Sequence, residues 1–182
     1  DVPFGQLMTD SLHAHIGVCP TVVLGNDANL GAVAEYVRGA ATATSSVVYL
    51  TGDVGVGGGV VLGGQVLAGG SGFAGELGHM VVNPTGQPCN CGSRGCWETE
   101  VGRDAVLSAV GFLPGQGSFS DLVADSPADH TEIKRALAGV GEWVGVGLVN
   151  LMNSIDPDYI VLGGHFAEIY PYISEVVDTR ID

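Results

Sequence analysis

Apolar residues in the first part of the chain gather in short runs, each ending at glycine or at the start of a helical pattern. TVVL over residues 21–24 predicts a strand, a turn follows at Gly25 and Asn26, and a helix follows the turn. SVVYL over residues 46–50 predicts a second strand. The next segments, TGDVGVGGG and VVLGGQVLAGG, predict a β-hairpin with a glycine-rich connection.

The last third contains the longest helical pattern of the chain. We expect this helix to begin with Thr131 as its N-cap and to end before Pro157. DYIVLGG over residues 158–164 predicts a short buried strand, and the final segment YPYISEVVDTRI predicts an amphipathic helix. The helical spacing of the long helix is carried by Ile133, Leu137, Val140, Val144, Leu148 and Leu151.

Two segments lack any such periodicity. Residues 83–95, NPTGQPCNCGSRG, contain turn residues throughout and predict a loop that needs an additional constraint to be ordered. Residues 111–129 are rich in Gly, Ser, Asp and Pro and predict loops around one short helix.

Composition and charge narrow the class of protein. The 182 residues are 46% hydrophobic, enough for one compact unit, and the formal net charge is −14. Such a surface repels phosphate backbones, so we do not expect this chain to bind nucleic acid by itself. No apolar run is long enough to span a bilayer and the start lacks the features of a signal peptide, which predicts a cytoplasmic protein without membrane contact. The first residue is not methionine and the last helix is cut short, so we expect a longer natural chain.

Three of the four cysteines lie close together in the sequence. Cys89, Cys91 and Cys96 follow His79 within eighteen residues, and zinc prefers four tetrahedral ligands of this type. A Cys3His set leaves no open position, so it predicts a structural zinc site that would order the loop. The alternative is a group of unliganded buried thiols beside a surface histidine. We interpret the isolated Cys19 as a small buried apolar residue.

Acidic and amide side chains flank these predicted zinc ligands and the first turn. Glu76 and Glu98 would lie near a common point, where carboxylates suit sugar hydroxyls; alternatively they are surface charges or partners of the metal ligands. Asn26 and Asp27 are placed at a strand-to-helix junction, where Asp27 could act as a general base. Both residue types are also favoured in turns and at N-caps, which is the simpler alternative.

Glycine makes up 30 of the 182 residues, and much of the excess lies between residues 52 and 78. Glycine lets the backbone approach a ligand closely. The run TGDVGVGGG is therefore a candidate phosphate cradle of backbone N–H groups, although glycine-rich hairpins have many other causes.

NDAN, the glycine-rich hairpin, GFAGELGH, CNCGSRGCWE and IVLGG occur in the order seen in the ROK family of repressors and sugar kinases, which the chain resembles over nearly its whole length. ELGH and the cysteine cluster are similar to the family's ExGH and CxCGxxGCxE signatures. The resemblance implies an α/β, actin-like and ribonuclease-H-like fold. Residues 1–30 would then be the end of the small lobe, and residues 31–182 most of the larger C-terminal lobe with its zinc loop.

The resemblance also implies a role for each matched residue. Sugar contacts would come from Asn26, Asp27, Glu76, His79 and Glu98, with Asp27 as the catalytic base if the protein is a kinase and His79 serving both zinc and sugar. ATP and magnesium would be needed only by a kinase. The nucleotide would then meet glycines of the hairpin turn and of the last strand: Gly55, Gly57, Gly58, Gly163 and Gly164.

One departure from the kinase pattern decides our preference between the two branches of the family. Kinases usually carry Gly-Thr-Gly where this chain has Asp53-Val54-Gly55, and Val54 lacks the hydroxyl while Asp53 repels phosphate. We therefore expect the sugar-binding part of a transcriptional regulator, whose DNA contact would come from a winged helix-turn-helix outside this sequence. An ATP-dependent hexose or N-acetylhexosamine kinase is the alternative, and a fold kept only for oligomerisation is a third. The family resemblance also implies a homo-oligomer.

Overall fold

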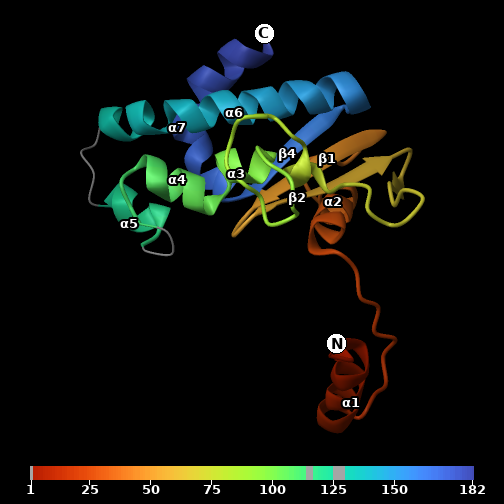
Figure 1. The fold of residues 1–182 in the computed structure, drawn as a ribbon. Helices are drawn as coiled ribbons and strands as arrows, with labels where there is room; N and C mark the ends of the chain where they lie inside the picture. Colours follow the sequence, from red (N-terminus) through yellow and green to blue (C-terminus); the bar gives the residue numbers. More distant parts are fainter. Residues whose placement is uncertain (1, 114–116, 125–129) are drawn as a thin grey trace.

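The computed structural model describes residues 2–113, 117–124 and 130–182 (Figure 1). One sheet carries the fold, with strand order β3-β2-β1-β4. The strands are β1 (Ser46–Gly52), β2 (Val56–Leu62), β3 (Gln65–Val66) and β4 (Tyr159–Gly164). The helices are α1 (Phe4–Ile16), α2 (Asp27–Arg38), the 3-10 turn η1 (Leu77–His79), α3 (Trp97–Val101), α4 (Arg103–Ala109), α5 (Phe119–Ala124), α6 (Thr131–Ile155) and α7 (His165–Ile181).

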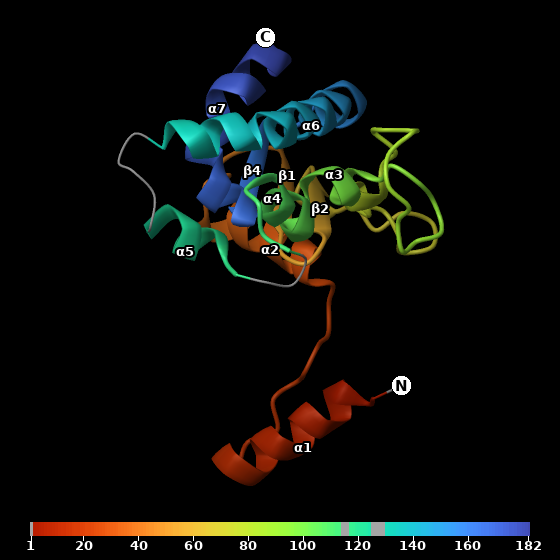
Figure 2. The same ribbon diagram turned by 60° about the vertical axis from the view of Figure 1, so that its left-hand side comes forward.

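Successive side chains of β1 point to opposite faces of the sheet, and helices pack on both of these faces. Val47 is buried with Ala32 of α2, whereas Val48 and Leu50 belong to the larger core with α6 and α7. β1 pairs antiparallel with β2 and parallel with β4. Figure 2 shows the result, with α2 on one side of the sheet and α6 and α7 on the other. This mixed, three-layer arrangement agrees with the predicted α/β class.

Asp158 joins the start of β4 to the start of β1. Its Oδ2 accepts hydrogen bonds from the backbone N–H of Ser45 and Ser46, at 2.8 and 2.9 Å, and from both serine hydroxyls. These donors, first of all the Ser45 hydroxyl, hold the pKa of Asp158 below its ordinary value. The contact spans more than a hundred residues, and no local pattern in the sequence indicates it.

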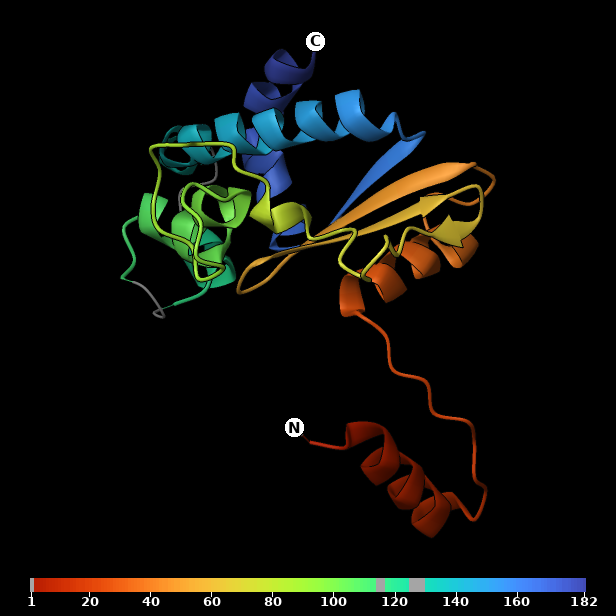
Figure 3. The same cartoon turned by 45° about the vertical axis from the view of Figure 1, so that its right-hand side comes forward.

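The segment before α2 differs from its prediction. Residues 17–26 form no strand, and Val23 and Leu24 are exposed. A strand requires a neighbouring backbone to pair with, and α1 with this segment extends away from the sheet in all the ribbon views (Figure 3). Cys19, predicted to be buried, is exposed here for the same reason.

Three further expectations are corrected in detail. Thr131 is the first helical residue of α6, so His130 and not Thr131 is the N-cap. β4 is only half-buried, because it lies at the edge of the described sheet. In the hairpin, only Asp53, Val54 and Gly55 form the connection, and Gly57 to Gly59 lie inside β2. The helices predicted at residues 131–155 and in the C-terminal segment are confirmed, as is one short helix, α5, in the 111–129 region, of which residues 114–116 and 125–129 lie outside the described residues.

None of the helices in the described part of the chain combines the length and apolar character needed to cross a membrane.

Candidate functional site

The structure brings the predicted metal ligands together. One ligand atom from each of His79, Cys89, Cys91 and Cys96 lies within 4.8 Å of the other three. The Sγ atom of Cys89 is 3.6 Å from Nδ1 of His79, and the Sγ atoms of Cys91 and Cys96 are also 3.6 Å apart. Three thiols and one imidazole match the donor set of a structural zinc site, so these residues fit the ion that the sequence predicts.

Backbone turns fold the loop 83–95 around this cluster. Gly92 and Gly95 have φ values of 91° and 67°, which residues with a side chain rarely adopt. The carbonyl of Gly95 accepts hydrogen bonds from the N–H groups of Val82 and Asn83, at 3.0 and 3.1 Å. The loop is thus tied back to the segment that follows η1, and Cys96 is brought to face His79.

Trp97 fixes the end of the loop on the protein core. Its side chain is fully buried, and its indole N–H donates to the carbonyl of Trp143 in α6 at 2.8 Å. A side chain on Gly147 would collide with the Trp97 ring, so the glycine of α6 makes room for it. The cysteine loop is therefore attached to α6 through Trp97.

Glu98 joins the thiol cluster to the space beside it. Its Oε1 lies 3.0 Å from Sγ of Cys89 and 3.6 Å from Nδ1 of His79. The hydrogen bond from the thiol to this carboxylate raises the pKa of Cys89 to about 12, and burial raises the pKa of Cys96. The backbone N–H of Ser93 lowers the pKa of Cys91. A metal that binds Cys89 must therefore displace a proton.

A cleft of about 340 Å³ adjoins the cluster and contains most of the predicted sugar contacts. Asp27 lies on one wall at the start of α2, and Glu76, His79 and Glu98 lie on the other. The rest of the lining comes from the β1–β2 turn and its flanks: Thr51, Asp53, Val54, Gly55, Val56 and Gly57. Four carboxyl groups, from Asp27, Asp53, Glu76 and Glu98, therefore line one opening, whereas the spacing of the motifs predicted a common point only for Glu76 and Glu98.

His79 stands between the thiols and the cleft. Nδ1 faces Cys89, whereas Nε2 lies 4.0 Å from Oε2 of Glu76. One ring nitrogen is thus directed to the metal ligands and the other to an acidic group of the cleft. This geometry suits a histidine that serves a metal and a second ligand at once.

The side chains of Asn26 and Asp27 make local hydrogen bonds at the start of α2, which is the simpler of the two predicted roles. Asn26 is the N-cap of α2, with its Oδ1 accepting from the N–H of Asn29 at 3.0 Å. Oδ1 of Asp27 accepts from the N–H of Ala28 at 2.8 Å. Asp27 still lines the cleft, while Asn26 lines a smaller hollow beside it together with Gly58 and Glu76.

The glycines of β2 let two elements approach the strand. A side chain on Gly59 would collide with the backbone carbonyl of Ala28, and one on Gly58 would meet Leu77 at 2.5 Å. α2 therefore lies close to one face of β2 and the η1 segment close to the other. Packing explains Gly58 and Gly59 without a phosphate, whereas Gly55 and Gly57 line the cleft itself.

A second cavity, of about 370 Å³, lies on the other side of the turn and shares Thr51 and Asp53 with the cleft. Gly164 lines it, but a side chain on Gly163 would meet the Tyr49 hydroxyl, so Gly163 serves packing. His165 lines it too, and its Nε2 donates to the carbonyl of Val101 at 2.9 Å. Burial lowers the pKa of His165 below its ordinary value.

Comparison with known proteins supports the assignment that the motifs imply. The model of the ROK family matches residues 6–181. This chain belongs to the ROK family. It is 32% identical to the xylose repressor of Bacillus spizizenii over 88% of this chain and 42% of that protein. It is 33% identical to the glucokinase of Halalkalibacterium halodurans over 79% of this chain and 48% of that protein.

Solved structures place the ROK chain in the actin-like ATPase fold, as predicted. A ROK glucokinase from Streptomyces griseus, crystallised with glucose and AMPPNP, matches with a TM-score of 0.76 and 27% identity, over 94% of this chain and 60% of that one. The chain spans less than half the length of the xylose repressor and of the glucokinase named above. The family includes both repressors and sugar kinases.

Proposed function

We propose that this ROK chain is the sugar-binding effector part of a transcriptional regulator of carbohydrate genes. The observation that carries the proposal is the turn Asp53-Val54-Gly55 at the edge of the cleft. The side chain of Val54 is 79% exposed there and offers no hydrogen bond, and Asp53 adds a negative charge. Such a turn is poorly suited to stabilise the phosphates of ATP.

The cleft supports sugar recognition by its donor and acceptor chemistry. Asp27, Glu76 and Glu98 line the same opening, and carboxylates accept hydrogen bonds from sugar hydroxyls. In our proposal Asn26 adds an amide from the neighbouring hollow. His79 would contact the sugar through Nε2 while Nδ1 binds the metal.

In the same proposal zinc is structural. It would be held by His79, Cys89, Cys91 and Cys96, and its chemistry would be to tie the loop together. The protein's own residues then bind and orient the sugar. A change in the relative position of the lobes on sugar binding would alter DNA affinity through a winged helix-turn-helix outside these residues.

A sugar kinase is the second candidate, and Asp27 favours it. An aspartate on the wall of a sugar-sized cleft can accept the proton of an attacking hydroxyl. In that case ATP and magnesium would lie near the β1–β2 turn, where Gly55 and Gly57 line the cleft and Gly164 lines the second cavity, whereas Gly58 and Gly163, also predicted at the nucleotide, serve packing. The xylose repressor and the glucokinase among the relatives make both functions chemically reasonable.

Two measurements on the full-length protein separate these functions. Hexoses, xylose and N-acetylhexosamines are tested first by thermal shift and then, with ATP and magnesium, in a coupled assay for ADP release. A regulator gives a shift without turnover, and Glu76→Ala removes the shift while the exposed control Glu142→Ala keeps it. Turnover that disappears in Asp27→Ala would establish the kinase instead. If no sugar gives a thermal shift, the remaining hypothesis is a fold that serves oligomerisation alone.

A further inference from the structure

We infer that the cleft selects uncharged sugars and rejects their phosphate esters, and that Asp53 is the specificity-determining residue. The inference rests on the proposed sugar site and concerns which sugars it admits. Its basis is the distribution of charge around the cleft and the hydrogen bonding of the turn that contains Asp53.

Acidic groups surround the cleft and basic groups do not. Asp27, Asp53, Glu76 and Glu98 line it, and none of the six Lys and Arg residues of the chain is among its lining residues. Carboxylates accept hydrogen bonds from hydroxyls without any charge penalty, so an uncharged sugar finds only favourable partners. A phosphate ester brings up to two negative charges to the same groups.

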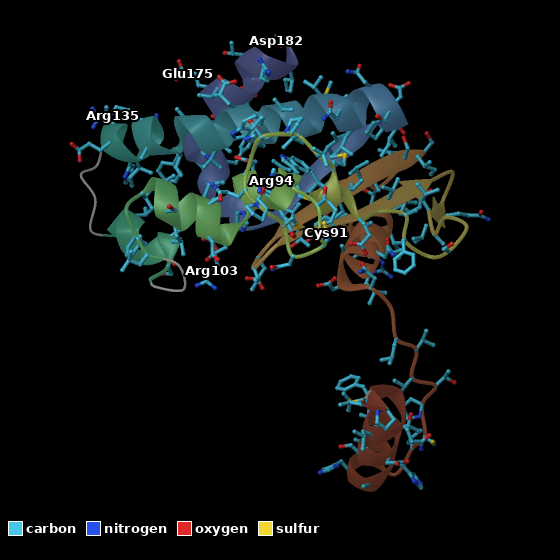
Figure 4. All side chains as sticks on the ribbon, viewed as in Figure 1. Cys91, Arg94, Arg103, Arg135, Glu175 and Asp182 are labelled. Atoms are coloured by element: carbon cyan, nitrogen blue, oxygen red, sulfur yellow. The ribbon has the colours of Figure 1, made fainter. Side chains whose placement is uncertain are left out.

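Arg94 and Arg103 both donate hydrogen bonds to backbone carbonyls and do not line the cleft. Arg94 donates to the carbonyl of Gly86 at 2.7 Å, within the zinc loop. Arg103 lines the second cavity and donates to the carbonyl of Gly117 at 3.3 Å. Figure 4 shows Arg103 beside α4 and Arg135 at the far end of α6, both away from Cys91 and the loop. A phosphate in the cleft would therefore meet no lysine or arginine of this chain.

Asp53 places a negative charge between the cleft and the second cavity, where a phosphate could otherwise bind. It is the one acidic residue that lines both the cleft and the second cavity. Its backbone N–H donates to the carbonyl of Gly55 at 3.0 Å, so the turn uses a donor that a phosphate cradle would need. An anion placed at the β1–β2 turn thus meets the Asp53 carboxylate, and the N–H of Asp53 is already bonded.

Isothermal titration calorimetry on the full-length protein tests this selectivity. Glucose, mannose and N-acetylglucosamine are each compared with their 6-phosphates, in low salt and in about 1 M salt, where screening extends only about 3 Å. We expect each phosphate to bind at least about tenfold more weakly than its parent sugar in low salt, with a smaller gap in high salt. Asp53→Asn should narrow the gap, whereas Asp10→Asn on α1, outside the cleft, should not.

Different failures have different meanings. A 6-phosphate that binds as tightly as its parent sugar, or more tightly, overturns the inference and leaves the proposed sugar site intact. An unchanged gap in Asp53→Asn removes Asp53 as the determinant. Phosphate binding that is lost in Arg103→Gln would show that the second cavity supplies the missing cation, which also overturns the inference. If neither sugars nor phosphates bind, the proposed function fails first.

Discussion

The two walls of the cleft are built in different ways. On the α2 wall, Ala28 and Ala32 are buried against β2, and the helix start is capped by Asn26. On the opposite wall, Glu76 precedes and His79 ends a three-residue 3-10 turn that has no side-chain cap. The loop that follows, which the structure describes in full, contains no strand but two isolated bridges, Val81 with Cys96 and Pro88 with Arg94, together with turn hydrogen bonds.

This difference separates two sources of order in one site. Packing and backbone hydrogen bonds stabilise the α2 wall, and both come from the protein alone. The opposite wall also has backbone hydrogen bonds and the Trp97 anchor, but it places a carboxylate and an imidazole beside three thiols, so its order depends in addition on what those thiols bind. The walls should therefore respond differently to the same treatments.

Metal removal should have the largest effect on the difference in order between the two walls. Chelation, or Cys96→Ser, should release the loop 83–96 and abolish sugar binding, because structural zinc sites contribute on the order of 10 kcal/mol. Hydrogen exchange should rise in the loop and change little in α2, and elemental analysis should show the bound zinc leave. The exposed Cys19→Ser is the matched control. If chelation changed hydrogen exchange in the loop no more than in α2, the order of this wall would not depend on a metal.

A collision beneath α2 should weaken the other wall. Gly59→Ala would place a methyl group against the carbonyl of Ala28 and at 2.8 Å from Cβ of Ala32. We expect a loss of about 1–3 kcal/mol in the free energy of unfolding, measured by urea denaturation, with zinc content unchanged. Gly70→Ala meets nothing within 4 Å and has no positive φ, so it should have a small effect. Similar losses for both variants would mean that close packing is not the reason for Gly59.

The cap of α2 allows a smaller and more local test. Asn26→Ala removes the acceptor of the Asn29 N–H and should cost about 1 kcal/mol of unfolding free energy. Asn26→Asp retains an acceptor and should recover most of it. If Asn26→Ala weakens sugar binding while Asn26→Asp restores stability but not binding, the amide itself contacts the sugar. Equal recovery of both would limit Asn26 to a capping role.

Acid should destabilise the scaffold through His165, by the smallest of these effects. Burial lowers the pKa of His165 in the fold, whereas the unfolded chain takes up a proton near its ordinary value of about 6.5. The stabilisation by the neutral ring is thus complete above that value and is lost as pH falls toward the folded pKa. His165→Asn should flatten this slope in urea denaturation between pH 7 and 5, and the exposed His13→Asn should not. If the dependence of unfolding free energy on pH were unchanged in His165→Asn, His165 would not be its source.

Local signals in the sequence predicted the elements whose causes are local. The helical spacing from Ile133 to Leu151 gave α6, and the glycines of the cysteine loop gave the turns that the structure contains. Cysteine spacing with one histidine predicted the ligand cluster, because a short loop can bring such residues to one point. The motif order gave the family, which the match over residues 6–181 confirms.

Other features depend on contacts that no local pattern encodes. TVVL has strand composition but no partner backbone, so residues 21–24 remain irregular. Gly58 and Gly59 resemble a phosphate-binding run in sequence, and only the approach of Leu77 and Ala28 shows that they serve packing. The sequence by itself determined the family, the main elements and the cluster of candidate metal ligands, because these follow from spacing along the chain. Only the tertiary structure decided which side chains share the cleft, how Asp53 and Glu98 link it to its neighbours, and which glycines face a helix, because those depend on segments that are distant in sequence and meet through packing.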